Sequence, residues 1–263
     1  MRLWSARSPA AIARAAAGAC SARGSCISLA RFALVCLIVC SAAAPASAEI
    51  GATASIFSDQ RFRGFSLSDD RPVAIGDIAY DDSAGFYADA SGSLVFRRGV
   101  NPAPLGLELA AGYATRLRSG TTIDFGITNS SFTHYSDDRH GQSYSEVYAG
   151  IARGIFSSRI FVSPHYFTSG RWTAYGEVNA NFSPARKWGL EAHVGMLSVL
   201  RTPAGQPYRA NVDWRLGASR ELGRISLHAA LTGHGHAPQP FGAALRQSSP
   251  RRNALVIGVT TTL

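Results

Sequence analysis

The chain has 263 residues and a formal net charge of +9. All four cysteines lie in the first 48 residues, together with five arginines and no acidic residue. The remainder therefore has no thiol and carries 21 basic against 17 acidic residues, a net charge of +4. This composition excludes a disulfide scaffold and a thiolate metal site, and the small charge argues against a nucleic-acid partner.

The N-terminal part has the features of an export signal. Arginines precede an apolar run at 32–40 that is too short to cross a bilayer as a helix, and a small-residue cleavage site of A-x-A type ends at Ala48. A lipoprotein signal at Cys40 is disfavoured by the bulky valine before it. We therefore expect a cleaved signal peptide at 1–48 and one domain at 49–263.

From residue 49 onward, short segments alternate apolar with polar or small residues, which is typical of β-strands that have one apolar face. The alternation is clearest at 209–219, where Val212 and Leu216 share one face and Asp213 and Arg215 share the other. One face suits hydrocarbon and the other suits water. About twelve such segments follow one another, near 50–58, 72–81, 85–96, 105–117, 121–132, 143–154, 157–167, 171–182, 188–199, 209–221, 224–234 and 253–263.

The connections between these segments carry a second signal, because short turns alternate with mostly longer loops. Outer-membrane barrels are built in this way, with the short turns in the periplasm. The final segment has an apolar face and could close the barrel against the first, so that no strand edge is left unpaired in the bilayer. Tight turns are expected near 82–84, 118–120, 155–156, 183–187 and 222–223, and longer loops near 59–71, 97–104, 133–142, 201–208 and 235–252.

Two all-β architectures fit this alternation. In a soluble periplasmic sandwich or lipocalin-like barrel, the apolar face points inward and is filled by large side chains. Here the apolar faces mix Ala and Gly with Leu, Ile and Trp, and the opposite faces carry many ionisable groups. We therefore predict an antiparallel transmembrane β-barrel of about twelve strands in a bacterial outer membrane, with both termini on the periplasmic side.

A family resemblance supports this prediction. The stretch SDQRFRGFSLSD at 58–69, Pro72 and DSAGFYA at 82–88 resemble the opening of the proteobacterial TorF-like porins, also known as the Gcw_chp family, and SEVYAG at 145–150 and SPHYF at 163–167 are similar to its central segments. The resemblance implies an outer-membrane barrel and a pore of undefined solute, with no catalytic residue to carry over. The chain departs from the family in its third strand, which lacks tryptophan.

The charged residues on the polar faces are the candidate functional residues. Fixed charge in a narrow aqueous lumen attracts counter-ions and repels ions of like charge. We expect a narrow pore for small solutes or ions; the alternative is a non-conducting structural or adhesion barrel, whose charges pair into a plug. The expected lumen charges are Glu108, Asp124, Glu146, Arg159, Glu177, Glu191, Asp213 and Arg215.

Arg61 and Arg63 bracket Phe62 in the first motif, where an extracellular loop or rim is expected. Their guanidinium groups could form ion pairs with the neighbouring acids Asp59, Asp69 and Asp70, or contact lipopolysaccharide phosphates. Intramolecular pairing is favoured because the acids are so near in sequence.

No enzyme signature is present in the sequence. There is no nucleophile elbow, phosphate loop, dinucleotide fingerprint or HExxH motif. His228, His234 and His236 share one strand parity, so a metal site is conceivable, but polar lumen or loop histidines are the favoured interpretation. We expect no catalytic residue, no metal and no cofactor.

Aromatic residues near segment ends indicate where the membrane lies. Tryptophan and tyrosine are enriched at both interfaces of a bilayer, where one end of the ring contacts hydrocarbon and the other contacts water. Outer-membrane lipid and lipopolysaccharide are therefore expected partners, besides small solutes or ions. The expected girdle residues are Tyr80, Tyr144, Tyr166, Phe167, Trp172 and Trp188.

Overall fold

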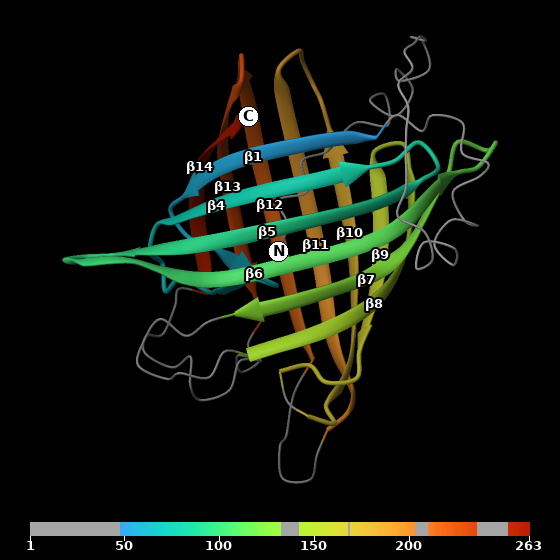
Figure 1. The fold of residues 1–263 in the computed structure, drawn as a ribbon, viewed down its shortest axis with the longest axis horizontal. Coiled ribbons are helices and arrows are strands. Elements are labelled where there is room, and N and C mark those ends of the chain that lie inside the picture. The colour runs from blue at the N-terminus through green and yellow to red at the C-terminus, as the bar shows by residue number, and fades with distance from the viewer. Residues whose placement is uncertain (1–47, 133–141, 168, 203–209, 236–251) are drawn as a thin grey trace, which may run out of the picture.

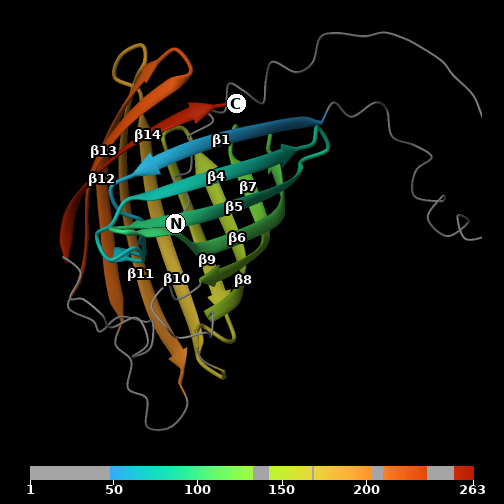
Figure 2. The same ribbon diagram turned by 60° about the vertical axis from the view of Figure 1, so that its left-hand side comes forward.

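The chain folds into a closed barrel of antiparallel strands (Figures 1 and 2). The computed structural model describes residues 48–132, 142–167, 169–202, 210–235 and 252–263. In this part of the chain, the strands neighbour one another around the wall in the order β1, β14, β13, β12, β11, β10, β9, β8, β7, β6, β5 and β4. Their bounds are β1 Glu49–Phe57, β4 Val73–Asp81, β5 Phe86–Arg97, β6 Val100–Arg116, β7 Thr122–Phe132, β8 Gln142–Arg153, β9 Phe156–Ser163, β10 Trp172–Phe182, β11 Trp188–Arg201, β12 Asn211–Leu222, β13 Ile225–His234 and β14 Asn253–Thr262.

The predicted all-β barrel and its strands are confirmed, with one difference of note. A loop is expected at 97–104, but β5 and β6 continue to pair through this stretch and only Arg98 and Gly99 turn the chain. Two register shifts interrupt the ladder of β5 and β6. Such irregularities tolerate proline, which lacks a backbone N–H, so Pro104 does not end the strand. The expected signal peptide at 1–48 lies almost entirely outside the described residues.

The barrel closes where the first wall strand meets the last. On one side β1 pairs with β14, with Phe57 opposite Gly258, and on the other side it pairs with β4, with Glu49 opposite Asp81. Every connection at the end of the barrel where β1 begins is short, and we call this the turn end. The opposite end is the loop end. As predicted, the start of β1 and the end of β14 lie together at the turn end.

The wall has an apolar outer face and a more polar inner face. In β12, Val212 and Leu216 are exposed on the outside, whereas Asp213, between them, is only 1% exposed. The same alternation of exposed apolar and buried or half-buried polar residues runs through the other wall strands. A continuous band of exposed Ile, Leu, Val and Phe suits contact with lipid. No helix in the described ranges is long and apolar enough to cross a membrane.

The connection between β1 and β4 folds into the barrel instead of forming an extracellular loop, so the expectation for 59–71 is wrong. Residues 59–68 are all buried, and they include the short strands β2 Arg61–Phe62 and β3 Phe65–Ser66. We call residues 59–70 the internal segment. Its apolar residues drive this placement: burying Phe62, Phe65 and Leu67 stabilises the inward position by about 1.5–3 kcal/mol each.

The hydrophobic core of the protein lies inside the barrel, toward the loop end. The three apolar residues of the internal segment pack there against inward-facing side chains of the wall. Tyr144 and Tyr166 belong to this core and are 3% and 0% exposed, so their expected place in an outer aromatic girdle is wrong. Tyr80, Trp172 and Trp188 are exposed on the barrel, as a girdle requires. The wall residues of the core are Phe57, Val73, Val95, Leu105, Phe132, Tyr144, Tyr175 and Leu197.

The two faces of β13 provide a test of this architecture. Leu231→Arg places a charge on the outer face, where arginine in the middle of a bilayer costs about 2–4 kcal/mol. We expect this variant to fold poorly into lipid vesicles, as measured by heat-modifiable mobility in gels. Ser226→Arg, on the inner face of the same strand and half-buried near the turn end, is the matched control and should fold as the wild type does. Equal damage from both substitutions would contradict a lipid-facing outer surface.

Candidate functional site: a charged lumen narrowed by an internal hairpin

The internal segment contains a two-residue hairpin. Arg61 pairs with Ser66 and Phe62 with Phe65, so Arg63 and Gly64 form the turn. Both turn residues have positive φ, 47° and 82°, as two-residue hairpin turns of type I′ require. A side chain at Gly64 would come within 2.7 Å of the carbonyl oxygen of Gly233, so the hairpin tip lies directly against the barrel wall.

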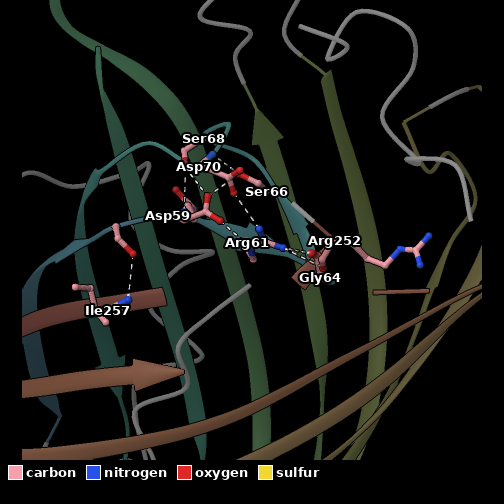
Figure 3. A network of polar contacts seen from close by, with 10 residues as sticks. Asp59, Arg61, Gly64, Ser66, Ser68, Asp70, Arg252 and Ile257 are labelled. Carbon is pink, nitrogen blue, oxygen red and sulfur yellow. Dashed lines mark hydrogen bonds and ion pairs between the residues drawn. The ribbon is translucent and has the colours of Figure 1, made fainter. Parts of the chain in front are cut away.

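Asp59 is the centre of the polar network that fixes the hairpin's shape (Figure 3). Its Oδ1 accepts hydrogen bonds from the hydroxyls of Ser66 at 2.6 Å and Ser68 at 2.7 Å, and its Oδ2 accepts one from Arg61 Nε at 2.7 Å. Burial raises the pKa of the Asp59 carboxyl, and these three donors act in the opposite direction. The donors thus stabilise the charged form that burial disfavours.

Arg61 connects the network to the rest of the segment and to the wall. Its Nη2 lies 3.0 Å from Asp70 Oδ1, and its Nη1 donates to the carbonyl oxygens of Gly64 at 3.0 Å and Arg252 at 3.5 Å. The favoured interpretation of Arg61, pairing with nearby acids of the same motif, is therefore correct. Its expected position at an exposed rim is wrong, because the side chain is 3% exposed.

Arg63 pairs with a residue far away in the sequence. Its Nη2 lies 2.6 Å from Oε2 of Glu146 on β8, and both side chains are almost fully buried. The guanidinium carbon also lies 4.0 Å from the ring centre of Tyr175, 5.2 Å from that of Tyr166 and 5.9 Å from that of Phe161. Such positions over aromatic faces stabilise a cation. Arg63 is thus held by one carboxylate and a cage of rings inside the barrel.

A cavity with several charged lining residues lies beside the hairpin. It has a volume of about 120 Å³, enough for several water molecules. Residues from β6 to β12 line it, together with Phe62 and Arg63 of the internal segment. Five of the eight predicted lumen charges are among the lining residues: Glu108, Glu146, Arg159, Glu177 and Arg215.

The other three predicted charges are next to this cavity, bound to residues of its lining. Asp124 Oδ2 accepts a hydrogen bond from Arg159 Nε at 2.7 Å. Glu191 Oε1 lies 3.0 Å from Arg215 Nε. All eight predicted residues thus face the inside of the barrel; their roles in conduction stay a prediction.

Asp213 is the most deeply buried of the predicted charges. Its Oδ1 lies 2.9 Å from His193 Nε2, and the hydroxyl of Tyr175 donates to its carboxylate at 3.2 Å. Asn179 Oδ1 in turn lies 2.7 Å from His193 Nδ1, so that one polar chain joins β10, β11 and β12. This network rigidifies the part of the wall against which the hairpin tip packs.

Sequence reasoning missed the neutral lumen residues that hold these charges. Tyr87 donates to Asp124 Oδ1 at 2.5 Å and also contacts the hydroxyl of Tyr148. Tyr148 shares strand parity with the predicted lumen charge Glu146 on β8. Tyr87 shares strand parity with Asp89 on β5, an acidic residue that was not among the predicted lumen charges. This parity is the signal that could have placed them inside.

The three histidines considered as possible metal ligands, His228, His234 and His236, remain without an assigned role. His228 lies near the ring of Phe57, and His234 Nδ1 contacts the carbonyl oxygen of Gly235 at 2.8 Å. His236 lies outside the described residues. Among the residues with described positions, no group of three or more His, Cys, Asp or Glu side chains has a geometry that could hold a metal ion.

The fold and the lumen define the class: a membrane-spanning β-barrel with an apolar exterior, a charged interior and an internal hairpin. A family described as "Bacterial protein of unknown function (Gcw_chp)" matches residues 41–262. The chain therefore belongs to the Gcw_chp family, as the resemblance indicated.

Solved structures with a similar fold include two porins. The KdgM porin superposes with a TM-score of 0.51 at 10% identity, over 81% of this chain and 99% of that chain. The NanC porin superposes with a TM-score of 0.53 at 9% identity, over 82% of this chain and 100% of that chain. At such low identity the likeness establishes the barrel fold. A comparison with curated proteins gave no match.

The buried ion pair of the hairpin tip can be tested by unfolding. Glu146→Gln leaves the Arg63 guanidinium buried without its carboxylate, and we expect a loss of about 3 kcal/mol in the free energy of unfolding. Urea titration of the refolded barrel, followed by tryptophan fluorescence, measures the loss. Glu177→Gln is the matched control, since Glu177 accepts a hydrogen bond from the neutral Asn179 side chain, and it should cost about 1 kcal/mol or less. Equal losses of unfolding free energy in the two variants would mean that the Arg63–Glu146 ion pair stabilises the barrel no more than an ordinary hydrogen bond does.

Proposed function

We propose that the protein is an outer-membrane porin, of the kind called TorF-like, with a narrow pore for small solutes or ions. The observation that carries the proposal is the cavity inside a closed barrel, lined by charged residues of both signs and by three tyrosines. A wall built only to fill its interior would not need water-accessible charge at its centre.

The internal segment would act as the constriction of this pore. It packs against the wall at several strands: Phe62 lies 5.6 Å from the ring of Phe132 on β7, Phe65 lies 4.0 Å from the ring of His234 on β13, and Arg63 binds β8. A segment anchored on both sides of the lumen would narrow a path through it. Only small solutes would then pass.

The rival function is a non-conducting structural or adhesion barrel. The same internal segment favours it, because a buried hairpin also serves as a plug. Conductance separates the two functions, since a porin passes current and a plugged barrel does not.

The experiment compares single-channel currents of the refolded wild type with those of a variant in which a Gly/Ser linker of equal length replaces residues 59–70. We expect current from the wild type and a several-fold larger conductance from the variant, because the linker lacks the anchors of the hairpin. A Gly/Ser replacement of the turn at 183–187, at the opposite end of the barrel, is the control and should leave the conductance unchanged. Current from the linker variant alone would make the segment a plug, and current from neither folded protein would overturn the porin proposal.

Outer-membrane lipid and lipopolysaccharide would surround the apolar band, and the signal peptide at 1–48 would direct the chain there. We expect the protein purified from the outer-membrane fraction of cells to begin at Glu49, because the A-x-A site ends at Ala48. N-terminal sequencing gives the answer. An uncleaved chain recovered from the inner membrane would contradict both the cleavage site and the location.

A further inference from the structure

We infer that the lumen selects positively charged solutes. The inference rests on the proposed pore and adds the sign of its selectivity, which the net charge of the chain does not give. It follows from how the wall strands distribute acidic and basic residues between their two faces.

Every acidic residue of the wall strands occupies an inward register position. Outward positions of the same strands hold basic residues, such as Arg153 and Arg220, but no acid in the described part of the wall. Three of the inward acids lie at the turn end: Glu49, Asp81 and Glu221. The eight that face the interior beyond it are Asp77, Asp89, Glu108, Asp124, Glu146, Glu177, Glu191 and Asp213.

Basic side chains compensate only part of this charge. The buried or inward-facing arginines of this stretch are Arg61, Arg63, Arg97, Arg159, Arg171 and Arg215. Arg61 pairs with Asp59 of the internal segment, and Arg63, Arg159 and Arg215 pair with Glu146, Asp124 and Glu191 respectively. With Asp59 added to the eight wall acids, nine acidic residues stand against six arginines. The described interior therefore carries an excess of negative charge.

Several of the remaining acids receive hydrogen bonds from neutral groups. Asp77 accepts from the hydroxyl of Thr53 at 3.0 Å, and Glu177 accepts from the amide of Asn179 at 3.2 Å. Neutral donors of this kind bring no positive charge, so they do not compensate these two carboxyl groups.

The confined geometry makes this excess effective. Charges that face a narrow lumen with low-dielectric walls focus the field, concentrate ions of opposite sign and reject ions of like sign. At low salt the Debye length exceeds the width of such a lumen, since it is about 30 Å at 0.01 M ionic strength. Cations should therefore be enriched at the cavity and anions depleted.

The aromatic residues of the interior act in the same direction. Arg63 shows how the wall accommodates a cationic group, with a carboxylate at 2.6 Å and the ring of Tyr175 at 4.0 Å from its guanidinium carbon. Arg159 lies over the ring of Tyr148 at 5.1 Å. Aromatic faces attract cations and offer nothing comparable to anions. Potassium-sized ions and small organic cations with an ammonium or guanidinium group fit this lining and the small cavity.

The test measures the reversal potential of the refolded wild type in a planar bilayer under a KCl gradient. We expect the reversal potential of the wild type to lie between zero and the equilibrium potential of K⁺. In the double variant Glu177→Gln, Glu191→Gln it should shift toward the equilibrium potential of Cl⁻. Arg63→Gln, which frees the Glu146 carboxylate, should shift the potential further toward K⁺. Arg220→Gln removes an arginine that stacks on Trp188 outside the lumen, and as the matched control it should change nothing.

The outcomes separate this inference from the proposed pore. A wild-type current with Cl⁻ preference, or a double variant with unchanged selectivity, overturns the cation preference and leaves the porin standing. A folded wild type without current overturns the porin and the inference with it. If Arg63→Gln fails to fold, the wild-type potential and the double variant still decide the sign.

Discussion

The closure of β1 against β14 is the constraint on which the rest of the structure depends. A bilayer offers no water to hydrogen-bond the N–H and C=O groups of a free strand edge, so a sheet can cross it only as a closed ring. Here the ladder from Phe57 to Thr53 supplies that closure at the seam. Once the ring is closed, the period of two along each strand sends alternate side chains to lipid and to the interior. The charged lumen is a direct consequence of a sheet with one apolar face.

A closed ring also creates an interior that must be filled or hydrated. Toward the loop end the protein fills it with the internal segment, whose apolar residues complete a core that the wall begins. The segment brings Arg63 with it, and a buried guanidinium would be costly without Glu146 and the surrounding rings. The hairpin tip is therefore matched to one position on the wall. The cavity lies beside this position, so one segment borders both the hydrophobic core and the cavity.

Alternation along the chain is a local property, which is why the strands, their faces and the barrel could be predicted from the sequence. The alternation of their immediate neighbours assigns Leu216 to the outer face and Asp213 to the inner face. The destination of the internal segment could not be read in this way, because Arg63 finds its partner on β8, 83 residues away. The nearby acids favoured a surface loop instead, and for Arg61 they are indeed the partners. The overlooked signal was apolar: Phe62, Phe65 and Leu67 are too many large hydrophobic residues for an exposed loop.

The net positive charge of the chain conceals an acidic interior, because the two signs occupy different places. Arginine and lysine at the turn end are exposed, where long side chains can reach water and lipid headgroups. Carboxylates have shorter side chains and are concentrated on the inner face, where arginine and amide side chains bind several of them. An outward acid in the middle of a wall strand would have neither water nor a partner, which accounts for its absence from the described strands. Exposed basic residues at this end include Arg118, Arg153, Arg186, Lys187, Arg220 and Arg224, so this part of the chain's positive charge lies outside the lumen.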